Sequence, residues 1–412
     1  MSASIANALW LNTPETRAVM AALDTVRPDG SRFVGGCVRN ALMGKDVDDI
    51  DIATQLLPEQ TIEAGKRAGL AAHPTGIEHG TITLVCNHVP FEVTTLRRDV
   101  STDGRRASVA FTEDWAEDAQ RRDFRMNALY ADGAGNIFDP TGGGIDDIAA
   151  GRVVFIGDGD TRLREDFLRA LRFFRFSAWY GKGPLDAEGL AACERQREGL
   201  KQLSGERIWK ELKKLMGAPD PRVSLKAMAE IGVAGIAFGE GLRLDRSLDW
   251  IGVEEALALM PDAMTRIAAA LADAESARAL ARRLKLSNDE RDRLVAALNV
   301  GAEIKPDLTP RAVRALVYRI GREAFIDRAR LAWAKDGLAR STEWRALVEI
   351  AATWERPKLP LSGEDVTALG VPRGPKVGQV IRAVEDWWVE ADFPDDAALI
   401  KERANAFAIG DV

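Results

Sequence analysis

The amino-acid sequence predicts an α+β protein, in which a mixed head of strands and helices is followed by a long all-helical part. Roughly the first 140 residues alternate short apolar runs with Gly, Asp and Pro, whereas the chain from Asp158 onward is rich in Ala, Leu, Arg and Glu. The length of 412 residues is too great for one ordinary domain. We therefore expect several domains, of which the first carries the sheet.

Three segments of the head have strand and turn signals. SRFVGGCVRNALMG (31–44) indicates a strand, a glycine turn and a helix, and VDDIDIAT (47–54) indicates a second strand. TITLVCNHVPFEVTTL (81–96) is typical of a hairpin with Asn87 and His88 near its turn. We expect these segments to build the sheet.

The helical part begins with two well-marked segments. DTRLREDFLRALRFFRFSAWYG (160–181) is predicted to be strongly helical. SGERIWKELKKLMG (204–217) predicts a helix with Ser204 as its N-cap and Gly217 as its stop. Further helical segments are EEALALM, ARALARRLKL and RDRLVAALNV, so we expect residues past 150 to be essentially all helix.

Composition excludes several classes of protein. The sequence has no run of eighteen apolar residues and no secretory leader pattern, so we expect neither a membrane span nor export. The three cysteines, Cys37, Cys86 and Cys193, are scattered, which fits a reducing cytoplasm and argues against a zinc site. The net charge of −7 says little about nucleic acid, because phosphate binding needs only a local excess of arginine and lysine.

Asp49 and Asp51 alternate in the second predicted strand. Alternate residues of a strand point to one face, so both carboxylates would project together. Mg²⁺ prefers a few carboxylate oxygens plus substrate phosphates, and two such ions can activate a hydroxyl and stabilise a leaving pyrophosphate. Glu92 would add a third carboxylate if its strand pairs beside the first. Taken alone, the two aspartates are better explained as surface residues, and for Glu92 the two explanations are level.

A glycine turn precedes these carboxylates. Gly35 and Gly36 follow an apolar pair and precede a helix start, where backbone N–H groups can bind phosphate and where Arg39 would lie in the first turn. Further along, Arg121 and Arg122 would ordinarily be solvated charge. Beside a carboxylate cluster they can instead hold triphosphate oxygens by bidentate contacts.

Four charged residues step by three along the predicted helix 160–181, namely Asp166, Arg169, Arg172 and Arg175. Successive members are neighbours on a spiral ridge, and on spacing alone a salt-bridged helix surface is the better explanation. The functional hypothesis is more specific, because it assigns the recognition of a nucleotide base to an Asp–Arg pair. An aspartate accepts and an arginine donates hydrogen bonds, so such a pair can read a base edge much as a nucleotide would.

Six ordered motifs carry a resemblance to a known family. FVGGCVRNALMGKDVDDIDIAT is followed by TGIEHGTITLV, FEVTTLR, DGRRASVAFTEDWAEDAQRRDFRMNAL, GDGDTRLREDFLRALRFFRFSA and GERIWKELKKLM. In this order they resemble the class II tRNA nucleotidyltransferases and bacterial poly(A) polymerases. LSGEDVTALGVPRGPKVGQVI (361–381) is similar to the C-terminal signature of that family. The resemblance is strong over residues 31–217 and patchy in the middle helical region.

The resemblance implies a polymerase-β-like head (1–150), a helical neck that recognises the base (151–217), and a helical body (218–345) and tail (346–412) that bind tRNA. It implies addition of C, C and A to the tRNA 3′ end from CTP and ATP with Mg²⁺, and contacts with the acceptor and T-arm region. We expect a cytoplasmic transferase that is a monomer or a weak homodimer.

The same resemblance implies that Asp49 and Asp51 are the metal ligands, and we count Glu92 with them as a candidate catalytic residue on the condition that its strand pairs beside theirs. The sequence departs from the family pattern at two positions, Asn40 and Arg125. Asn40 occupies a position that is often Asp in GGxVRD, and Arg125 replaces the usual Thr of RRDFTxNA. Both keep polarity, so we expect tuning of activity rather than its loss.

The implied nucleotide pocket draws on both parts of the chain. Gly36, Arg39 and Arg122 would contact the phosphates or sugar. Asp166 and Arg169 would pair with the base, and Arg172 and Arg175 would complete the pocket.

Several specificities remain as alternatives. The segment from Arg97 to Val109 is in the place of a flexible loop that CC-only enzymes shorten, and its full length favours complete CCA addition over CC-only or A-only activity. A basic element typical of poly(A) polymerases is missing, which makes poly(A) synthesis a weaker alternative than CCA addition. An inactive tRNA-binding protein is the non-enzymatic alternative, and the intact carboxylates argue against it.

No histidine follows His88, which excludes an appended histidine–aspartate phosphohydrolase domain. Arg373 and Lys376 could contact tRNA or serve only packing.

Overall fold

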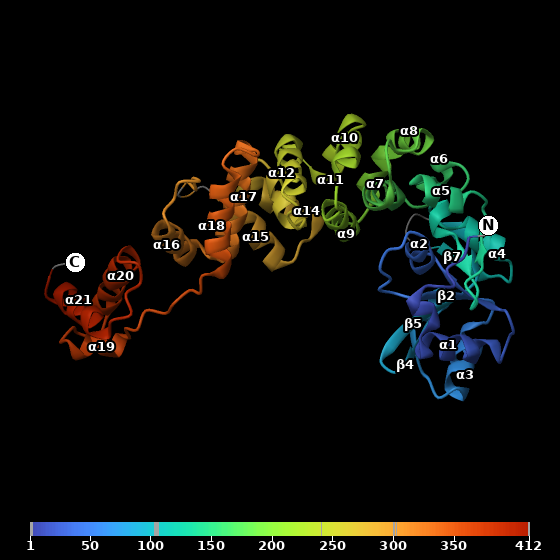
Figure 1. Cartoon of the computed structure of the whole chain (residues 1–412), viewed down its shortest axis with the longest axis horizontal. Coiled ribbons are helices and arrows are strands. Elements are labelled where there is room, and N and C mark those ends of the chain that lie inside the picture. The colour runs from blue at the N-terminus through green and yellow to red at the C-terminus, as the bar shows by residue number, and fades with distance from the viewer. Residues whose placement is uncertain (1–2, 103–106, 240, 300, 302, 411–412) are drawn as a thin grey trace. The chain divides into compact units, whose positions relative to one another are not determined.

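The computed structural model describes residues 3–102, 107–239, 241–299, 301 and 303–410 (Figure 1). The chain forms two compact units, Met1–Gly239 and Glu240–Val412. The first unit contains a sheet and helices, and the described part of the second is helical. The boundaries of head, neck, body and tail remain predictions.

A seven-stranded sheet forms the centre of the head, in the order β3-β4-β5-β2-β1-β8-β9. Its strands are β1 (Ser31–Val34), β2 (Asp51–Thr54), β3 (Ala71–Gly76), β4 (Thr81–Cys86), β5 (Val89–Thr95), β8 (Tyr130–Ala131) and β9 (Ile137–Phe138). The β2–β5 pair is parallel, and the other neighbouring strands run antiparallel. A separate hairpin pairs β6 (Arg97–Thr102) with β7 (Ala107–Phe111). It holds the predicted flexible loop, of which residues 103–106 lie outside the described residues.

Short helices cover and connect these strands. Two of them, α1 (Pro14–Asp24) and α3 (Pro58–Arg67), contact each other and pack on β4 (Figure 1). The other helical elements of the head are η1 (Leu9–Asn12), α2 (Gly36–Leu42), η2 (Ile77–His79), α4 (Trp115–Gln120), η3 (Arg125–Asn127) and α5 (Gly144–Ala150).

The predicted hairpin and glycine turn are confirmed. Asn87 and His88 join β4 to β5 with φ values of 48° and 68°, the positive pair that a tight two-residue hairpin turn requires. Gly35 has a φ of 73° between β1 and α2, as expected for a glycine at a strand-to-helix turn. The strand predicted over 47–54 is shorter, because β2 begins only at Asp51.

The helices that follow the sheet complete the first unit. They are α6 (Gly159–Glu165), α7 (Leu168–Tyr180), α8 (Ala187–Gln196), η4 (Arg197–Gln202), α9 (Gly205–Met216), α10 (Arg222–Glu230) and α11 (Val233–Phe238). The limits predicted for the helix over 204–217 are confirmed, with Ser204 at the N-cap position and Gly217 at the C-cap.

The segment 160–181 is helical, as predicted, but it is interrupted at Asp166 and forms α6 and α7 instead of the single helix on which Asp166 was placed. The chain leaves helical geometry at Asp166, where φ is −156° and ψ is 105°. The Asp166 carboxylate accepts the N–H of Leu168 at 3.1 Å, a local bond that competes with helix continuation and starts α7 afresh. Asp166 therefore precedes the helix on which Arg169, Arg172 and Arg175 lie.

A cluster of phenylalanines joins the segments around Phe124 and Phe155 to α7. Phe124 lies 5.0 Å from Phe155 and 5.2 Å from Phe176, measured between ring centroids, and Phe155 stacks on Phe173 at 5.5 Å. Phe124 and Phe173 are completely buried. This packing fixes the arginines of α7 relative to the segment that begins at Arg121.

The second unit is built from helices around two apolar clusters. They are α12 (Leu244–Ala256), α13 (Ala263–Ala269), α14 (Ala274–Leu284), α15 (Asn288–Leu298), α16 (Pro310–Ile320), α17 (Arg322–Asp336), α18 (Ser341–Thr353), α19 (Gly363–Ala368), α20 (Pro375–Glu390) and α21 (Ala397–Ile409). Trp250, Trp333 and Trp344 are buried in one cluster, and Trp388 lies in the other. Past residue 150 the described residues form no strand, which confirms the helical prediction. None of the described helices is long and apolar enough to span a membrane.

Candidate active site

Asp51 and Glu92 face each other across the parallel β2–β5 pair. Their neighbours Ile52 and Val93 are each 1% exposed and belong to the core, whereas Asp51 is half-buried and Glu92 is exposed. The strand pairing on which a role for Glu92 depended is therefore present. The prediction that Asp49 shares a strand with Asp51 is wrong, because Asp49 lies exposed in the segment before β2.

The carboxylates of Asp51, Glu92 and Asp49 create a local negative charge that a bound cation would stabilise. Burial raises the pKa of Asp51 to about 6, and repulsion from Glu92 and Asp49 adds to the rise, while Arg122 opposes it. Among the described residues, no three His, Cys, Asp or Glu side chains form a ready metal cluster. Mg²⁺ fits this donor set, since it is commonly held by one or two carboxylates together with substrate phosphates.

Arg122 lies against the glycine turn. Its Nη1 is 3.6 Å from the position that a Cβ would take at Gly35. Buried Asp118 accepts from Arg122 Nη2 at 3.1 Å, from Arg121 at 2.9 Å and from the Tyr130 hydroxyl at 2.7 Å. The carboxylate therefore fixes Arg122 where the backbone of the turn leaves space for a ligand.

Arg39 is a buried cation surrounded by neutral partners. It is 6% exposed, and its guanidinium donates to Asn127 Oδ1 at 2.6 Å, to Asn40 Oδ1 at 2.8 Å and to the Tyr180 hydroxyl at 2.8 Å. Burial lowers the pKa of Arg39. No carboxylate of the described residues forms an ion pair with Arg39, so its positive charge is not neutralised directly.

The arginines of α7 are held by acidic side chains from other elements. Arg172 Nε donates to buried Asp123 at 2.7 Å. Arg175 Nε donates to Glu211 of α9 at 2.5 Å, and Glu211 also lies 3.8 Å from Arg172. These ion pairs give the two guanidinium groups fixed positions.

Asp166 and Arg169 have separate partners. Asp166 accepts from Arg207 Nη2 at 2.7 Å. Arg169 donates to the carbonyl of Arg121 at 2.9 Å, to the carbonyl of Arg162 at 3.0 Å and to Glu165. The guanidinium has five donors, so Arg169 keeps N–H groups for another acceptor.

These side chains line one pocket of about 400 Å³. It is lined by Gly35, Gly36, Arg39, Asp51, Arg122, Asp123, Asn127, Asp166, Arg169, Arg172, Arg175 and Phe176. All seven residues of the predicted nucleotide pocket are there, together with Asp51. Asp49 and Glu92 are not among the lining residues.

Sequence reasoning missed several members of this site. Asp123 and Asn127 lie four residues apart in the motif RRDFRMN, and that spacing was an available signal. Phe176, one residue beyond Arg175, closes one side of the pocket. Glu211 and Arg207 of α9 do not line the pocket but contact the lining residues Arg175 and Asp166, and nothing local in the sequence predicts these contacts.

The two departures from the family pattern have different surroundings. Asn40 holds Arg39 through its side-chain oxygen. Arg125 instead makes a bidentate contact with the buried carboxylate of Asp147, at 2.6 and 2.8 Å, and does not line the pocket. Arg125 therefore fastens α5 to η3.

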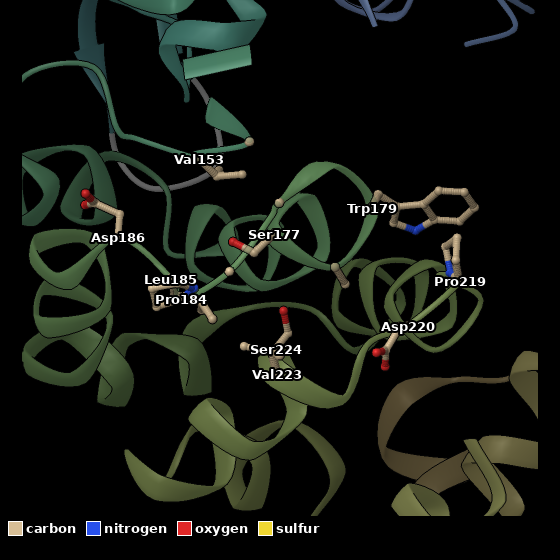
Figure 2. Close-up of a pocket in the computed structure, with 14 residues that line it drawn as sticks. Val153, Ser177, Trp179, Pro184, Leu185, Asp186, Pro219, Asp220, Val223 and Ser224 are labelled. Atoms are coloured by element: carbon tan, nitrogen blue, oxygen red, sulfur yellow. The ribbon is translucent and has the colours of Figure 1, made fainter. Parts of the chain in front are cut away.

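A second pocket of the first unit has a different chemistry. It measures about 360 Å³ and lies at the end of α7, with Trp179 at one end and Asp186 at the other (Figure 2). No arginine or lysine is among its lining residues. It therefore does not suit a triphosphate.

The fold and the site together define the class of protein. Residues 31–154 match the model of the poly A polymerase head domain, and residues 184–241 match that of a probable RNA and SrmB-binding site of polymerase A. A sheet with carboxylates beside an arginine-lined pocket, within such a head, is that of a nucleotidyltransferase. The relatives narrow this class, and the chain belongs to the family of CCA-adding tRNA nucleotidyltransferases.

The similarity extends over nearly the whole chain. The mitochondrial CCA tRNA nucleotidyltransferase 1 of Danio rerio is 31% identical over 88% of this chain and 84% of its own length. The CCA-adding enzyme of Streptococcus sanguinis is 30% identical over 93% of this chain and 95% of its own. The crystal structure of the Bacillus stearothermophilus CCA-adding enzyme in complex with CTP superimposes with a TM-score of 0.72 at 26% identity, covering 96% and 98% of the two chains.

Proposed function

We propose that this enzyme adds C, C and A to the 3′ end of tRNA from CTP and ATP without a nucleic-acid template. One observation carries the proposal: arginines of the head and of α7 line a single pocket together with Asp51. The names of the relatives support the choice of substrates.

Asp49 and Asp51 are proposed to hold Mg²⁺, with Glu92 as a nearby catalytic carboxylate. Mg²⁺ held there would lower the pKa of the attacking 3′ hydroxyl and neutralise charge on the leaving pyrophosphate. Arg39 and Arg122 bind the triphosphate, since both are held rigidly by other residues and can form charge-assisted hydrogen bonds to its oxygens.

Asp166 and Arg169 are proposed to choose the base. Cytosine and adenine each present an amino donor beside a ring-nitrogen acceptor, which match the Asp166 carboxylate and the Arg169 guanidinium. Uracil and guanine present a carbonyl beside a ring N–H, the opposite pattern. They would leave the Asp166 carboxylate and the Arg169 guanidinium without a partner on the base, which costs about 1–3 kcal/mol for each group once the nucleotide excludes water.

Two further expectations accompany this function. The three cysteines are free, and Cys37 and Cys193 are buried, which supports the proposal of a reducing compartment such as the cytoplasm. A monomer or weak homodimer is the proposed state in solution, and sedimentation over a range of concentrations measures it.

The test is an extension assay on tRNA that lacks its 3′ CCA. Each nucleoside triphosphate is supplied alone and then with the others, and products are sized to one nucleotide. Two additions with CTP alone and three with CTP plus ATP are expected. A product that stops after two C residues would indicate a CC-adding enzyme, and a long A ladder would indicate a poly(A) polymerase.

Asp51→Ala tests the role of the carboxylate in the same assay. The turnover number is expected to fall by at least about 100-fold, the scale of losing one electrostatic contact to the transition state. Asp48→Ala is the matched control, because Asp48 is an exposed aspartate three positions away. Equal activity of the two variants contradicts the proposed site.

A further inference from the structure

The last residue of α7, Tyr180, lies against Arg39 of the nucleotide pocket. Its hydroxyl accepts a hydrogen bond from Arg39 Nη2 at 2.8 Å, and Arg39 Cζ lies 4.1 Å from the centroid of its ring. A hydrogen bond and a cation–π contact therefore both act on the guanidinium. Tyr180 is not one of the described residues that line the pocket, so its hydroxyl reaches the pocket through Arg39.

The partners of Arg39 use most of its capacity to donate hydrogen bonds. A guanidinium has five N–H donors. Nε and Nη2 donate to Asn40 Oδ1 at 3.1 and 2.8 Å, and Nη1 donates to Asn127 Oδ1 at 2.6 Å. The second N–H of Nη2 goes to the Tyr180 hydroxyl. Among the described residues, one N–H of Nη1 is left without a partner, and its direction is set once the other donors are held.

The Asn40 amide is also held in place. Its Nδ2 donates to the carbonyl of Asp46 at 2.8 Å, which turns Oδ1 toward Arg39. An aspartate at this position would have no N–H for that carbonyl and would place a negative charge beside the guanidinium. In this chain neutral oxygens hold Arg39, and they fix its direction without neutralising its charge.

The last turn of α7 is itself tied to the head. The Lys45 ammonium donates to the carbonyl of Trp179 at 2.8 Å and lies 4.7 Å from the centroid of the Tyr180 ring. Carbonyls of a last helical turn carry the negative end of the helix dipole, which favours a cation there. Lys45 follows α2, the helix that carries Arg39. This contact keeps the Tyr180 hydroxyl in register with the guanidinium.

Arg39 depends on such contacts because it is a buried cation near another cation. Burial lowers the pKa of Arg39, and repulsion from Arg175 adds to the effect. A charge in this position is drawn toward water unless acceptors hold it. Asn40 and Asn127 supply acceptors from the head, whereas Tyr180 supplies the one that comes from α7.

We propose that Tyr180 is a positioning residue that directs Arg39 toward the triphosphate of the bound nucleotide. The inference rests on the proposed function for the role of Arg39 in binding phosphate. Since the base is proposed to meet Asp166 and Arg169 instead, Tyr180 should affect CTP and ATP alike and leave the choice between bases unchanged.

The test is Tyr180→Phe, which removes the hydroxyl and keeps the ring. Binding of CTP, ATP and inorganic tripolyphosphate to the full chain is measured by calorimetry with Mg²⁺ and without tRNA. We expect all three dissociation constants to rise by a common factor of about 5, the scale of one lost hydrogen bond to a charged group. In extension assays the KM for CTP should rise likewise, while the ratio of CTP to UTP addition stays the same.

A double-mutant cycle shows whether Tyr180 acts through Arg39. In an Arg39→Gln background, Tyr180→Phe should weaken CTP binding no further, because the partner of the hydroxyl is gone. An equal loss in both backgrounds would mean that Tyr180 only supports the fold, and it would overturn the proposal. Unchanged CTP binding by Tyr180→Phe alone would overturn it too, and tighter binding would show that the hydroxyl competes with the ligand for Arg39.

The single variant remains decisive if Arg39→Gln does not fold. A loss of affinity for CTP that tripolyphosphate does not share would place the effect of Tyr180 on the base or sugar and contradict the proposal. Tyr318→Phe is the matched control, because it removes a tyrosine hydroxyl that donates to Glu385 at 2.6 Å in the second unit. It should leave the binding of all three ligands unchanged.

Extension of tRNA by the same preparations separates this proposal from the proposed function. If the wild type extends tRNA with CTP and ATP while Tyr180→Phe binds CTP normally, the function stands and the role of Tyr180 is wrong. If the wild type binds CTP but extends no tRNA, the function is wrong. Equal losses for CTP and tripolyphosphate in Tyr180→Phe would then still support its role in phosphate binding.

Discussion

Arg207 holds the carboxylate of Asp166 at 2.7 Å, so a residue of α9 sets the direction of a side chain that lies between α6 and α7. The other oxygen of Asp166 accepts the N–H of Leu168. Two contacts from different elements therefore fix the carboxylate plane. A fixed plane is what an acceptor needs if it is to discriminate between an amino group and a carbonyl.

The first prediction concerns the choice of nucleotide. Arg207→Gln should release Asp166 and raise the rate of UTP or GTP addition relative to CTP by about 10-fold, the equivalent of roughly 1.4 kcal/mol of lost discrimination. Arg207→Lys should recover part of the discrimination because it keeps a cation there. Single-nucleotide addition with each triphosphate measures the ratio.

Lys210→Gln is the control for that change, because Lys210 is an exposed cation of the same helix. It should leave the ratio unchanged. If Arg207→Gln lowers the rates with CTP and UTP equally, then Arg207 only supports the fold and does not position Asp166 for base choice.

Glu211 gives a second prediction, about nucleotide affinity. Its carboxylate is buried and holds Arg175, with Arg172 nearby. Glu211→Gln should let both guanidinium groups move, so the KM for CTP should rise about 10-fold with a smaller change in turnover number. Glu230→Gln, at an exposed position of α10, is the control. Equal losses in turnover number and in kcat/KM for Glu211→Gln would contradict a role in nucleotide binding.

The parts of the fold that follow from local rules could be predicted from the sequence. The glycine turn at Gly35 and the hairpin turn at Asn87 and His88 each depend on a few adjacent residues with positive φ. Strand alternation predicted that Glu92 faces away from the core between Phe91 and Val93, whereas its pairing with Asp51 was left open and is shown only by the register of β2 and β5. Such features depend on the period of side chains along an element, which the sequence displays directly.

Features that depend on competition or on distant partners could not be predicted. The break at Asp166 interrupts a segment whose pattern is helical, because a side-chain bond to Leu168 N replaces the helical bond. The contacts of Arg207 and Glu211 join residues 36 or more positions apart. No periodicity connects such positions, so only the packed structure shows which charges meet.

The glycine turn gives a third prediction, which distinguishes the effect of backbone strain on stability from an effect on nucleotide binding. Gly35→Ala places a Cβ at a φ of 73° and 3.6 Å from Arg122 Nη1, so it should cost about 1–2 kcal/mol of stability and also raise the KM for CTP. Gly44→Ala has a similar φ of 64° with no atom within 4 Å of the new Cβ. It should leave the KM for CTP unchanged. Chemical denaturation and initial rates on the two variants measure the two effects, and equal KM values would contradict a ligand at the turn.

Asp118 gives the last prediction, about stability in acid. Burial alone would raise the pKa of Asp118, but Arg122 and Arg121 outweigh it and hold the pKa at about 2. The folded state therefore binds this proton less tightly than the unfolded state does. The stability that Asp118 contributes is fully present above the ordinary aspartate pKa, near 4, and is lost as the pH falls from about 4 to 2.

Asp118→Asn should therefore destabilise the protein at pH 7 by about 3 kcal/mol, because it removes a buried carboxylate and leaves two half-buried arginines without their anion. The variant should also lose less stability than the wild type between about pH 4 and pH 2, since the titrating group is gone. Urea unfolding across this range measures both effects. Asp146→Asn, at an exposed position in the first turn of α5, is the control and should follow the wild type. Parallel acid profiles for wild type and Asp118→Asn would mean that the Asp118 carboxylate is not the anion that stabilises Arg121 and Arg122.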